Sequence, residues 1–303
     1  FPGAGRAAVR SHIDDPTRDI ALIFRSSPFG AISHSHASNN DFVLHVAGRC
    51  LVMPSGHYAG YGSNHHAHWV WHTKSHNCVT LSDAGQIMRS HDSVGAVEHA
   101  FEDERVAYFR GTADASYADR ARRCRRHVAW LKAHRCFVMI DEFVAVPGIV
   151  SALQWNAHSW DQFTVDEDAR SFRVERGDST LSGHFMYHHN SFFSLSEGFD
   201  PPPAPARDGR AWPNQHHLRF TPAGLVSVRN LGVVLCPGHA GLAGAPVATE
   251  RVDGAEVARI GDDLAVVNMG GALSVDGIDS DALGVLRLDG HIYEIRDDGL
   301  TAR

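Results

Sequence analysis

The stretch Phe24-Arg-Ser-Ser-Pro-Phe-Gly-Ala-Ile-Ser-His-Ser-His-Ala37 begins in one short run that favours β structure, Asp19–Arg25, and leads toward a second, Asp41–Ala47. Apolar branched and aromatic residues dominate both runs, whereas the residues between them include the turn formers Pro and Gly. This pattern predicts two strands joined by a connection that carries a pair of histidines, His34 and His36.

Further runs of the same kind recur along the chain, separated by Gly, Pro, Asn and Asp residues. They are Asn77–Leu81, Val106–Arg110, Arg126–Leu131 and Cys136–Val144, and others follow beyond Ser151. Short strands at this spacing, with turn signals between them, are typical of β-sandwiches. The sequence therefore predicts an all-β fold, an antiparallel β-sandwich.

Two regions are expected within this fold. Residues 1–230 are predicted to form one large antiparallel β-sandwich that carries a histidine-rich site. Residues 231–303 are predicted to form a smaller C-terminal β-sheet region, which either closes the main sandwich or stands as a sheet of its own. In this second region Asp289-Gly290 predicts the turn of a hairpin over Gly284–Ile295.

A few segments depart from the strand pattern. The one candidate helix is Tyr117–Arg123, which fits a basic loop equally well. The arginine-rich cluster Arg120–Arg126 is expected to be a solvated face, and a path for an anionic polymer is the alternative. The alternation of Trp69 and Trp71 suggests a strand-like run with at least one core tryptophan, and Pro201-Pro-Pro-Ala-Pro-Ala predicts a rigid extended connection.

Composition describes a globular chain without a basic surface. The sequence has 303 residues, 43% of them hydrophobic, and a formal net charge of −7, with no long block of like charge. No nucleic-acid or membrane partner is therefore expected, and an anionic substrate would need local cations. No apolar run is long enough for a membrane span, and residues 1–5 lack the features of a signal peptide. The five cysteines are scattered and predict mostly buried thiols.

Histidines are concentrated in one segment. Nine of the 22 histidines lie between His34 and His76. In an extended stretch, residues two apart point to the same side, so His34 and His36 are expected to face one pocket. Imidazole titrates near neutral pH and also binds zinc, so such a pair suits proton transfer or metal binding.

This segment, from Phe24 to Gln86, resembles the heparinase II/III-like polysaccharide lyase family, and within it the oligoalginate-lyase-like branch. The resemblance begins with the quoted stretch and with Asn40-Asp-Phe-Val-Leu-His. It continues through Gly48-Arg-Cys-Leu-Val-Met-Pro-Ser-Gly-His-Tyr, Tyr61-Gly-Ser-Asn-His-His-Ala-His-Trp, Thr73-Lys-Ser-His-Asn and Ala84-Gly-Gln. The resemblance implies the C-terminal β-sandwich of that family and a bacterial protein of the periplasm or the exterior.

The resemblance also implies roles for individual histidines. His34 matches the histidine beside the sugar, where it neutralises a carboxylate or moves a proton. His36 and His76 match zinc ligands. Pro54 stands where many members have a third, aspartate ligand, so zinc requires a substitute such as His57 or His66, or else the site is free of metal.

Other residues are candidates for contact with the substrate. Tyr58 and Tyr61 are assigned to catalysis beside His34, because a tyrosine hydroxyl is a competent acid or base for elimination; aromatic packing under a loop is the alternative. Arg25 is expected to bind a uronate carboxylate through its planar guanidinium, unless it forms a surface ion pair. The remaining candidates for substrate binding are Asn40, His66 and Trp69.

The residue types favour β-elimination over hydrolysis. Elimination next to a uronic acid removes the C5 proton, stabilises the resulting anion and protonates the departing C4 oxygen, and histidine and tyrosine suit these steps. Hydrolysis requires two positioned carboxylates, but Asp41 is the only one between Ser33 and Asn77. The expected substrate is an anionic uronate polysaccharide or oligosaccharide, alginate-like or glycosaminoglycan-like.

Two other functions remain as alternatives. A cupin-like metal-dependent oxidoreductase or isomerase has a similar histidine pair before a Pro-x-Gly turn. In cupins, however, two strands normally separate the two motifs, whereas here a single Gly48 would have to close the first motif and open the second. A non-catalytic carbohydrate-binding β-sandwich is compatible with the aromatic residues, although it needs no histidine cluster.

The resemblance finally implies a partner. Lyases of this family place a helical (α/α) toroid before the sandwich, and nothing upstream of His34 has the apolar periodicity of long helices. We therefore expect a helical toroid domain or chain to complete the substrate groove, and the present chain to be a fragment, a processed product or one half of a two-part enzyme.

Overall fold

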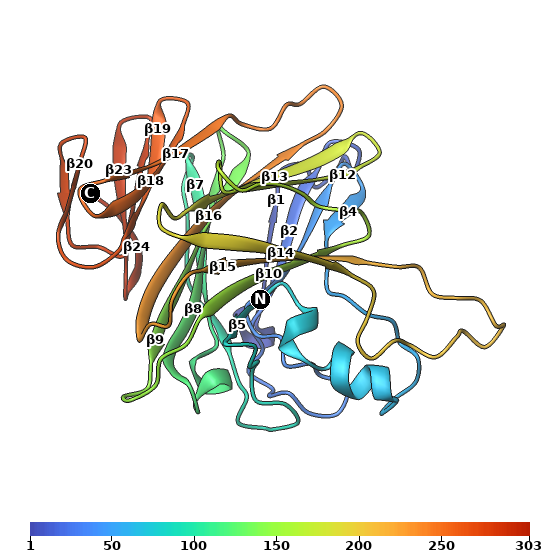
Figure 1. Ribbon diagram of the computed structural model, residues 1–303. Helices are drawn as coiled ribbons and strands as arrows, with labels where there is room; N and C mark the ends of the chain where they lie inside the picture. The colour runs from blue at the N-terminus through green and yellow to red at the C-terminus, as the bar shows by residue number, and fades with distance from the viewer.

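The computed structural model describes residues 1–303 as twenty-four strands in five sheets, with every strand pair antiparallel (Figure 1). This arrangement confirms the predicted all-β antiparallel fold. The predicted strands Asp19–Arg25, Asp41–Ala47 and Cys136–Val144 agree with the observed ones to within one residue at each end.

Two four-stranded sheets make up the first layer. One has the order β1-β2-β3-β4, with bounds Arg6–Arg10, Ile20–Arg25, Asp41–Val46 and Arg49–Val52. The other has the order β14-β15-β10-β5, with bounds Ser191–Glu197, His216–Pro222, Leu153–Ser159 and Val79–Leu81.

An eight-stranded sheet forms the second layer, and a six-stranded sheet forms the third. The former has the order β11-β12-β13-β16-β9-β8-β7-β6, with bounds Thr164–Asp166, Ser171–Arg176, Ser179–Met186, Val228–Gly238, Cys136–Ala145, Ala121–Leu131, Val106–Thr112 and Ala96–Glu102. The latter has the order β17-β18-β19-β22-β23-β24, with bounds Val247–Val252, Ala255–Ile260, Asp263–Asn268, Gly284–Leu288, His291–Arg296 and Gly299–Ala302. A small hairpin, β20 (Leu273–Val275) and β21 (Ile278–Ser280), completes the fold.

Two hydrophobic cores hold the three layers together. Residues such as Phe24, Trp155 and Phe137 form the larger core, between the two four-stranded sheets and one face of the eight-stranded sheet. The opposite face of that sheet packs on the six-stranded sheet through residues such as Val138 and Leu286. Strand β9 is thus covered on both sides, which explains its nearly unbroken run of buried residues.

The C-terminal sheet is built largely as a hairpin series. The predicted hairpin is present as β22 and β23, with Asp289 and Gly290 at its turn. The predicted boundary after residue 230 falls inside β16, and the chain passes to the six-stranded sheet only between Gly238 and Val247.

Helical structure is limited to four short segments, Pro2–Ala4, His66–Val70, Thr73–Ser75 and Asp114–Tyr117. The helix considered for Tyr117–Arg123 is wrong, because β8 already begins at Ala121 and pairs with β9. The strand-like interpretation of Trp69 and Trp71 is also wrong, since His66–Val70 is a π-helical turn. No helix has both the length and the apolar character required to cross a membrane.

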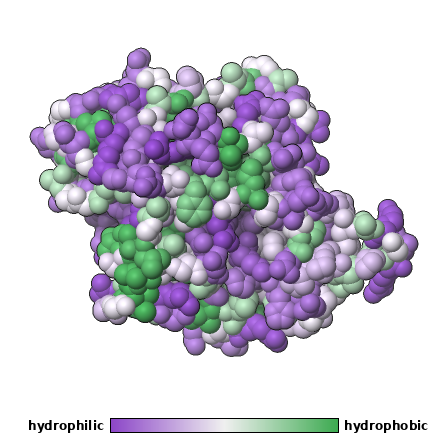
Figure 2. Space-filling model, in the orientation of Figure 1, coloured by the Kyte–Doolittle hydropathy of each residue, from purple (hydrophilic) through white to green (hydrophobic).

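The surface in this orientation is mainly hydrophilic, with a green apolar patch over the ends of β9 and β16 (Figure 2). Exposed apolar side chains after β9 and at or before the start of β16 include Val150, Leu225 and Val228. The segment after β14, which includes the predicted extended Pro201–Ala206, contains no strand until β15 and projects from the body of the molecule (Figure 1).

Candidate active site

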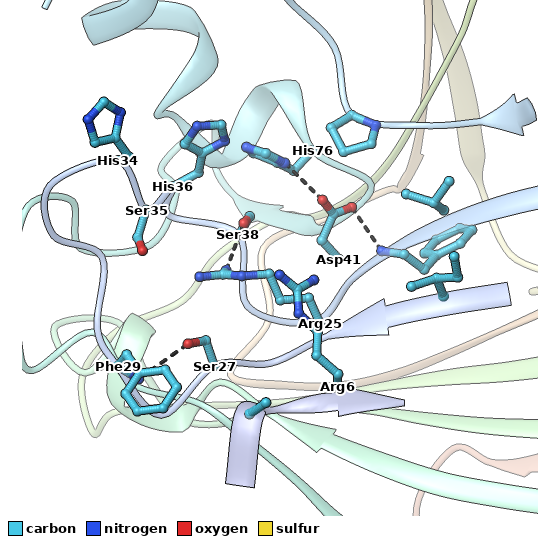
Figure 3. A pocket seen from close by; sticks show the side chains of 15 residues that line it. Arg6, Arg25, Ser27, Phe29, His34, Ser35, His36, Ser38, Asp41 and His76 are labelled. Atoms are coloured by element: carbon cyan, nitrogen blue, oxygen red, sulfur yellow. Dashed lines mark hydrogen bonds and ion pairs between the residues drawn. The ribbon is translucent and has the colours of Figure 1, made fainter. Parts of the chain in front are cut away.

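A cavity of about 590 Å³ lies on the outer face of the first sheet. Alternation along β2 and β3 turns Phe24 and Phe42 toward the core, while Ile23, Arg25 and Val43 line the cavity. The loop between these strands supplies His34 and His36 on the facing side (Figure 3). The predicted strand–loop–strand unit therefore builds most of this site.

His34 and Tyr61 come together at the rim of the cavity. Their ring centroids are 4.7 Å apart, and both side chains are exposed. The Tyr61 hydroxyl lies 3.5 Å from the carbonyl oxygen of Ser33, to which it donates. This pairing places an imidazole and a phenol, two groups capable of proton transfer, beside one another in solvent.

His66 links the two predicted tyrosines. Its ring centroid is 5.2 Å from that of Tyr58 and 5.6 Å from that of Tyr61, and it packs on Trp71 at 4.5 Å. His66 itself is only 1% exposed, and burial lowers its pKa below the ordinary value. It therefore supports the two tyrosines from beneath.

His36 lies deeper than His34. Its ring centroid is 5.2 Å from that of His76 and 6.3 Å from that of His66. Burial, followed by the charges of His76 and His66, lowers the pKa of His36 to about 3. His36 is consequently a neutral imidazole at physiological pH, whereas its neighbour His34 stands in solvent.

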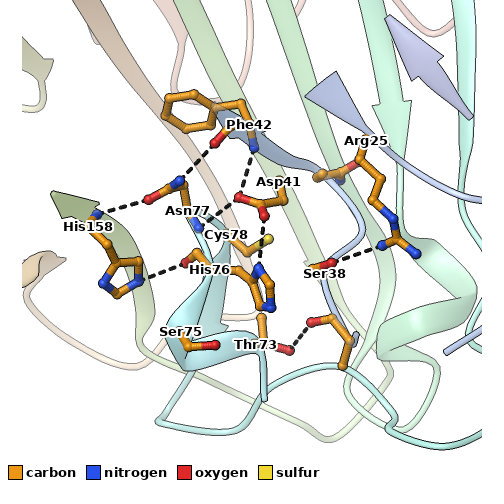
Figure 4. A network of polar contacts seen from close by, with 12 residues as sticks. Arg25, Ser38, Asp41, Phe42, Thr73, Ser75, His76, Asn77, Cys78 and His158 are labelled. Carbon is orange, nitrogen blue, oxygen red and sulfur yellow. Dashed lines mark hydrogen bonds and ion pairs between the residues drawn. The ribbon is translucent and has the colours of Figure 1, made fainter. Parts of the chain in front are cut away.

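A buried network fixes His76 (Figure 4). Asp41 Oδ2 lies 2.8 Å from His76 Nδ1, and Asp41 Oδ1 accepts hydrogen bonds from the backbone N–H groups of Phe42 and Asn77, both at 2.9 Å. The other ring nitrogen of His76, Nε2, lies 3.1 Å from the carbonyl oxygen of Val70. Both the carboxylate and the imidazole are therefore held by partners within the protein.

Arg126 ties this network to the eight-stranded sheet. The guanidinium is 0% exposed and donates to both carboxylate oxygens of Asp141, at 2.7 and 2.9 Å. Its Nη1 also donates to the backbone carbonyls of Asn40 and Asn77, at 2.8 and 2.6 Å. The expectation that Arg120–Arg126 is a solvated face is therefore wrong for Arg126, which braces the residues flanking Asp41 and His76.

The side chains around His36 and His76 do not provide three protein ligands for a zinc ion. No group of three His, Cys, Asp or Glu side chains is placed to hold a metal ion. Pro54 lines the cavity, and the proposed substitute His57 stacks instead on Trp212 with a centroid distance of 4.8 Å. Zinc at His36 and His76 stays a prediction from the resemblance, and no chemical step is assigned to it.

Three predicted substrate contacts are corrected by burial. His66, at 1% exposed, offers no face to a sugar. Asn40 is 5% exposed, and its Nδ2 donates to the carbonyl of Cys124. Trp69 is 9% exposed and donates through Nε1 to Ser55 Oγ. Both side chains belong to the interior, so neither offers a face for a sugar. Arg25, by contrast, is half-buried and reaches the cavity.

Arg6 is the cavity residue that sequence reasoning missed. It lies in β1 directly opposite Arg25 in β2. The short run Arg-Ala-Ala-Val-Arg from position 6 is only a weak strand signal, and its pairing partner depends on the tertiary fold. Phe29, 64% exposed, is a second cavity residue outside the predicted set.

Comparisons with known proteins give one family and a consistent fold. The family described as heparinase II/III-like, C-terminal, matches residues 1–202. No curated protein matches the sequence.

Among solved structures, heparan sulfate lyase HepC from Pedobacter heparinus superposes with a TM-score of 0.67 at 14% identity and covers 100% of this chain. A mutant of that lyase gives 0.68 at 15% identity over 99% of this chain, and the heparinase III BT4657 gene product gives 0.67 at 14% over 100%. This chain spans 41% of the length of each of these proteins. At such identities the likeness shows a shared fold.

Proposed function

This chain belongs to the heparinase II/III-like family, and from that membership we propose that it is the β-sandwich part of a polysaccharide lyase. The proposed reaction is cleavage of a uronic-acid-containing polysaccharide or oligosaccharide by β-elimination. The contact between His34 and Tyr61 carries the proposal, because it joins two proton-transfer groups at the rim of a cavity that also contains arginine.

The residues suit the two proton movements of the reaction. A base takes the proton from C5 of the uronate, the C5–H electrons form the C4=C5 double bond, and the C4–O bond breaks. An acid then gives a proton to the departing oxygen. In this proposal His34 and Tyr61 perform these transfers, and Tyr58 packs against His66, whose ring also contacts Tyr61.

Charge stabilisation is assigned to Arg25. Removal of the C5 proton places negative charge on the uronate carboxylate, and a guanidinium aimed into a cavity stabilises such charge. The Nη1 of Arg25 donates to Ser38 Oγ at 2.9 Å, which orients the side chain without neutralising it. The neutral His36 beside it adds no competing charge.

A helical partner is part of the proposal. The cavity is open on the side of His34, Tyr58 and Tyr61, the last two being 60% and 51% exposed. Enclosure strengthens electrostatic stabilisation and excludes water from reactive intermediates. The solved relatives in fold are more than twice as long as this chain, which leaves them room for a further domain. We place the enzyme in the bacterial periplasm or outside the cell.

A screen of uronate polymers tests the function. Alginate, heparan and chondroitin polymers are incubated with the protein, and formation of a double bond conjugated with the carboxylate is followed by ultraviolet absorbance. The proposal expects absorbance to rise with at least one polymer. Binding without any cleavage, with a helical domain present, would favour a carbohydrate-binding sandwich instead.

A further inference from the structure

Arg6 and Arg25 place two positive charges opposite each other on adjacent strands. They are directly paired in the antiparallel register of β1 and β2, so both side chains leave the same face of the sheet. Figure 3 shows both on the strand side of the cavity, below the loop that carries His34. Like charges at directly opposed positions destabilise a strand pair, so an anion bound between them would stabilise this arrangement.

No carboxylate of the protein forms an ion pair with either of these arginines. Arg10 provides the contrast, because it follows Arg6 by four residues in β1, lies on the same strand face and binds Asp19 at 2.6 Å. The one carboxylate that lines the cavity, Asp41, is already held by His76 and two backbone N–H groups. Arg6 and Arg25 are therefore left without a direct anionic partner within the protein.

The surroundings of Arg25 make its positive charge less favourable still. Burial is the first cause that lowers its pKa, and the charge of Arg6 is the second; the charge of Asp41 acts in the opposite direction and is weaker. The Nη1 of Arg25 donates to Ser38 Oγ, a neutral acceptor, so the guanidinium is oriented toward the cavity without losing its charge. Beside it Ile23 is 43% exposed and offers an apolar surface to a ring.

We propose that Arg6 and Arg25 form an oxyanion subsite, which binds a carboxylate or sulfate ester of a sugar residue in the cavity. The identification of the ligand as a sugar rests on the proposed lyase function. The subsite adds to that function a group that recognises the acidic substituent of the sugar. An oxyanion between the two guanidinium groups accepts charge-assisted hydrogen bonds and relieves the repulsion between the strands. Arg6 is thus a specificity residue that works together with Arg25.

The test measures binding rather than turnover. Thermal unfolding of the chain is followed in increasing sodium sulfate and in increasing sodium glucuronate, each compared with chloride at equal ionic strength. The proteins are the wild type, Arg6→Gln, Arg25→Gln and the control Arg10→Gln. Sulfate stabilises folded proteins generally, so the informative quantity is the difference between the variants in the same salt.

The wild type and Arg10→Gln are expected to gain a saturable rise in melting temperature, and Arg6→Gln and Arg25→Gln to bind the same anion about tenfold more weakly. If the variants lose more of the wild-type response in sulfate than in glucuronate, the subsite binds a sulfate ester; a larger loss in glucuronate identifies a carboxylate. Arg6→Gln should also melt higher than the wild type in chloride, because the repulsion is gone.

Equal responses of all four proteins in both salts would overturn the subsite. Because no turnover is measured, the result is separable from the proposed function. A protein that binds the anion through Arg6 but yields no unsaturated product contradicts the lyase proposal alone.

Discussion

At the scale of single residues, the two histidines of the first loop have different surroundings. His34 is exposed beside Tyr61, whereas His36 is held among His66 and His76 with a pKa of about 3. One is open to solvent, and the other lies deeper in the cavity.

Substitution by alanine should separate these roles. His34→Ala is expected to lower turnover by about 10² to 10⁴, the usual contribution of a proton-transfer group, with little change in melting temperature. His36→Ala is expected to lower both, because it removes a packed ring. Unchanged activity of His34→Ala, measured with the helical partner present, would contradict the assignment.

Sequence reasoning selected His34, Tyr61 and Arg25 by residue type, and the structure brings His34 and Arg25 to one cavity with Tyr61 against His34, while their roles stay predictions. It misplaced Asn40, His66 and Trp69, since a polar or aromatic side chain has the same appearance in a sequence whether it faces solvent or the core. It missed Arg6 because only the register of β1 against β2 brings that residue to Arg25.

At the scale of elements, β8 and β9 connect the site to the body of the fold. Arg126 in β8 binds Asp141 in β9 and reaches the backbone beside Asp41 and His76. Asp141→Asn should lower the free energy of unfolding by about 3 to 5 kcal/mol, because it leaves a buried guanidinium uncompensated.

Chemical denaturation measures this change. The control is Asp119→Asn, which disrupts the exposed contact with Arg120 at 3.6 Å and should cost no more than about 1 kcal/mol. Similar losses of unfolding free energy in both variants would show that the buried Arg126–Asp141 pair contributes no more to stability than an exposed pair does.

The ion pair between Arg123 in β8 and Glu142 in β9 predicts that stability depends on pH. Burial by itself would raise the pKa of Glu142, but His127 and Arg123 lower it from the ordinary 4.5 to about 2. The Arg123 Nη1 lies 2.9 Å from Glu142 Oε1, whereas His127 Nε2 is 3.8 Å from Oε2, so Arg123 is the closer partner.

A carboxyl group with a depressed pKa stabilises the folded state fully above its unfolded value and loses that contribution as the pH falls through its folded value. The stability advantage of the wild type over Glu142→Gln should therefore shrink as the pH falls from about 4.5 to about 2. Unfolding free energies at several pH values check this, and a constant difference would contradict it.

The strands named from the sequence were predictable because alternating and continuous apolar runs are local signals, and β1 and β6 were not among them. The beginning of β8 was not predictable, since its sequence Ala-Arg-Arg-Cys-Arg-Arg is strongly charged. Its arginines are tolerated in a strand because they meet acids that are distant in sequence, among them Asp141, Glu142 and Asp297.

At the scale of the whole molecule, the site lies on the outer face of a three-layered β structure. The sequence resemblance to the heparinase II/III-like family is confirmed by the match over residues 1–202, while the oligoalginate-lyase-like branch stays a prediction. The layers themselves were only partly predictable. The predicted boundary after residue 230 is wrong because β16 pairs with β9 and β13 and so belongs to the eight-stranded sheet, and the sequence does not show this pairing.

The open cavity predicts dependence on a helical partner. The chain alone should bind uronate oligomers weakly and turn them over barely or not at all, and addition of a helical domain should restore activity. Steady-state rates with and without that domain check the prediction. Cleavage by the chain alone, shown by mass to be free of partner, at about 1 per second or more would contradict it.

The most direct test of β-elimination counts two kinds of new chain end as a uronate polymer is cut by the protein together with a helical domain. Ultraviolet absorbance counts ends with a C4=C5 double bond, and a reducing-sugar assay counts all cleavages. We predict one unsaturated end for every new reducing end, with both lost together in His34→Ala. New reducing ends without absorbance would mean hydrolysis and would contradict the account.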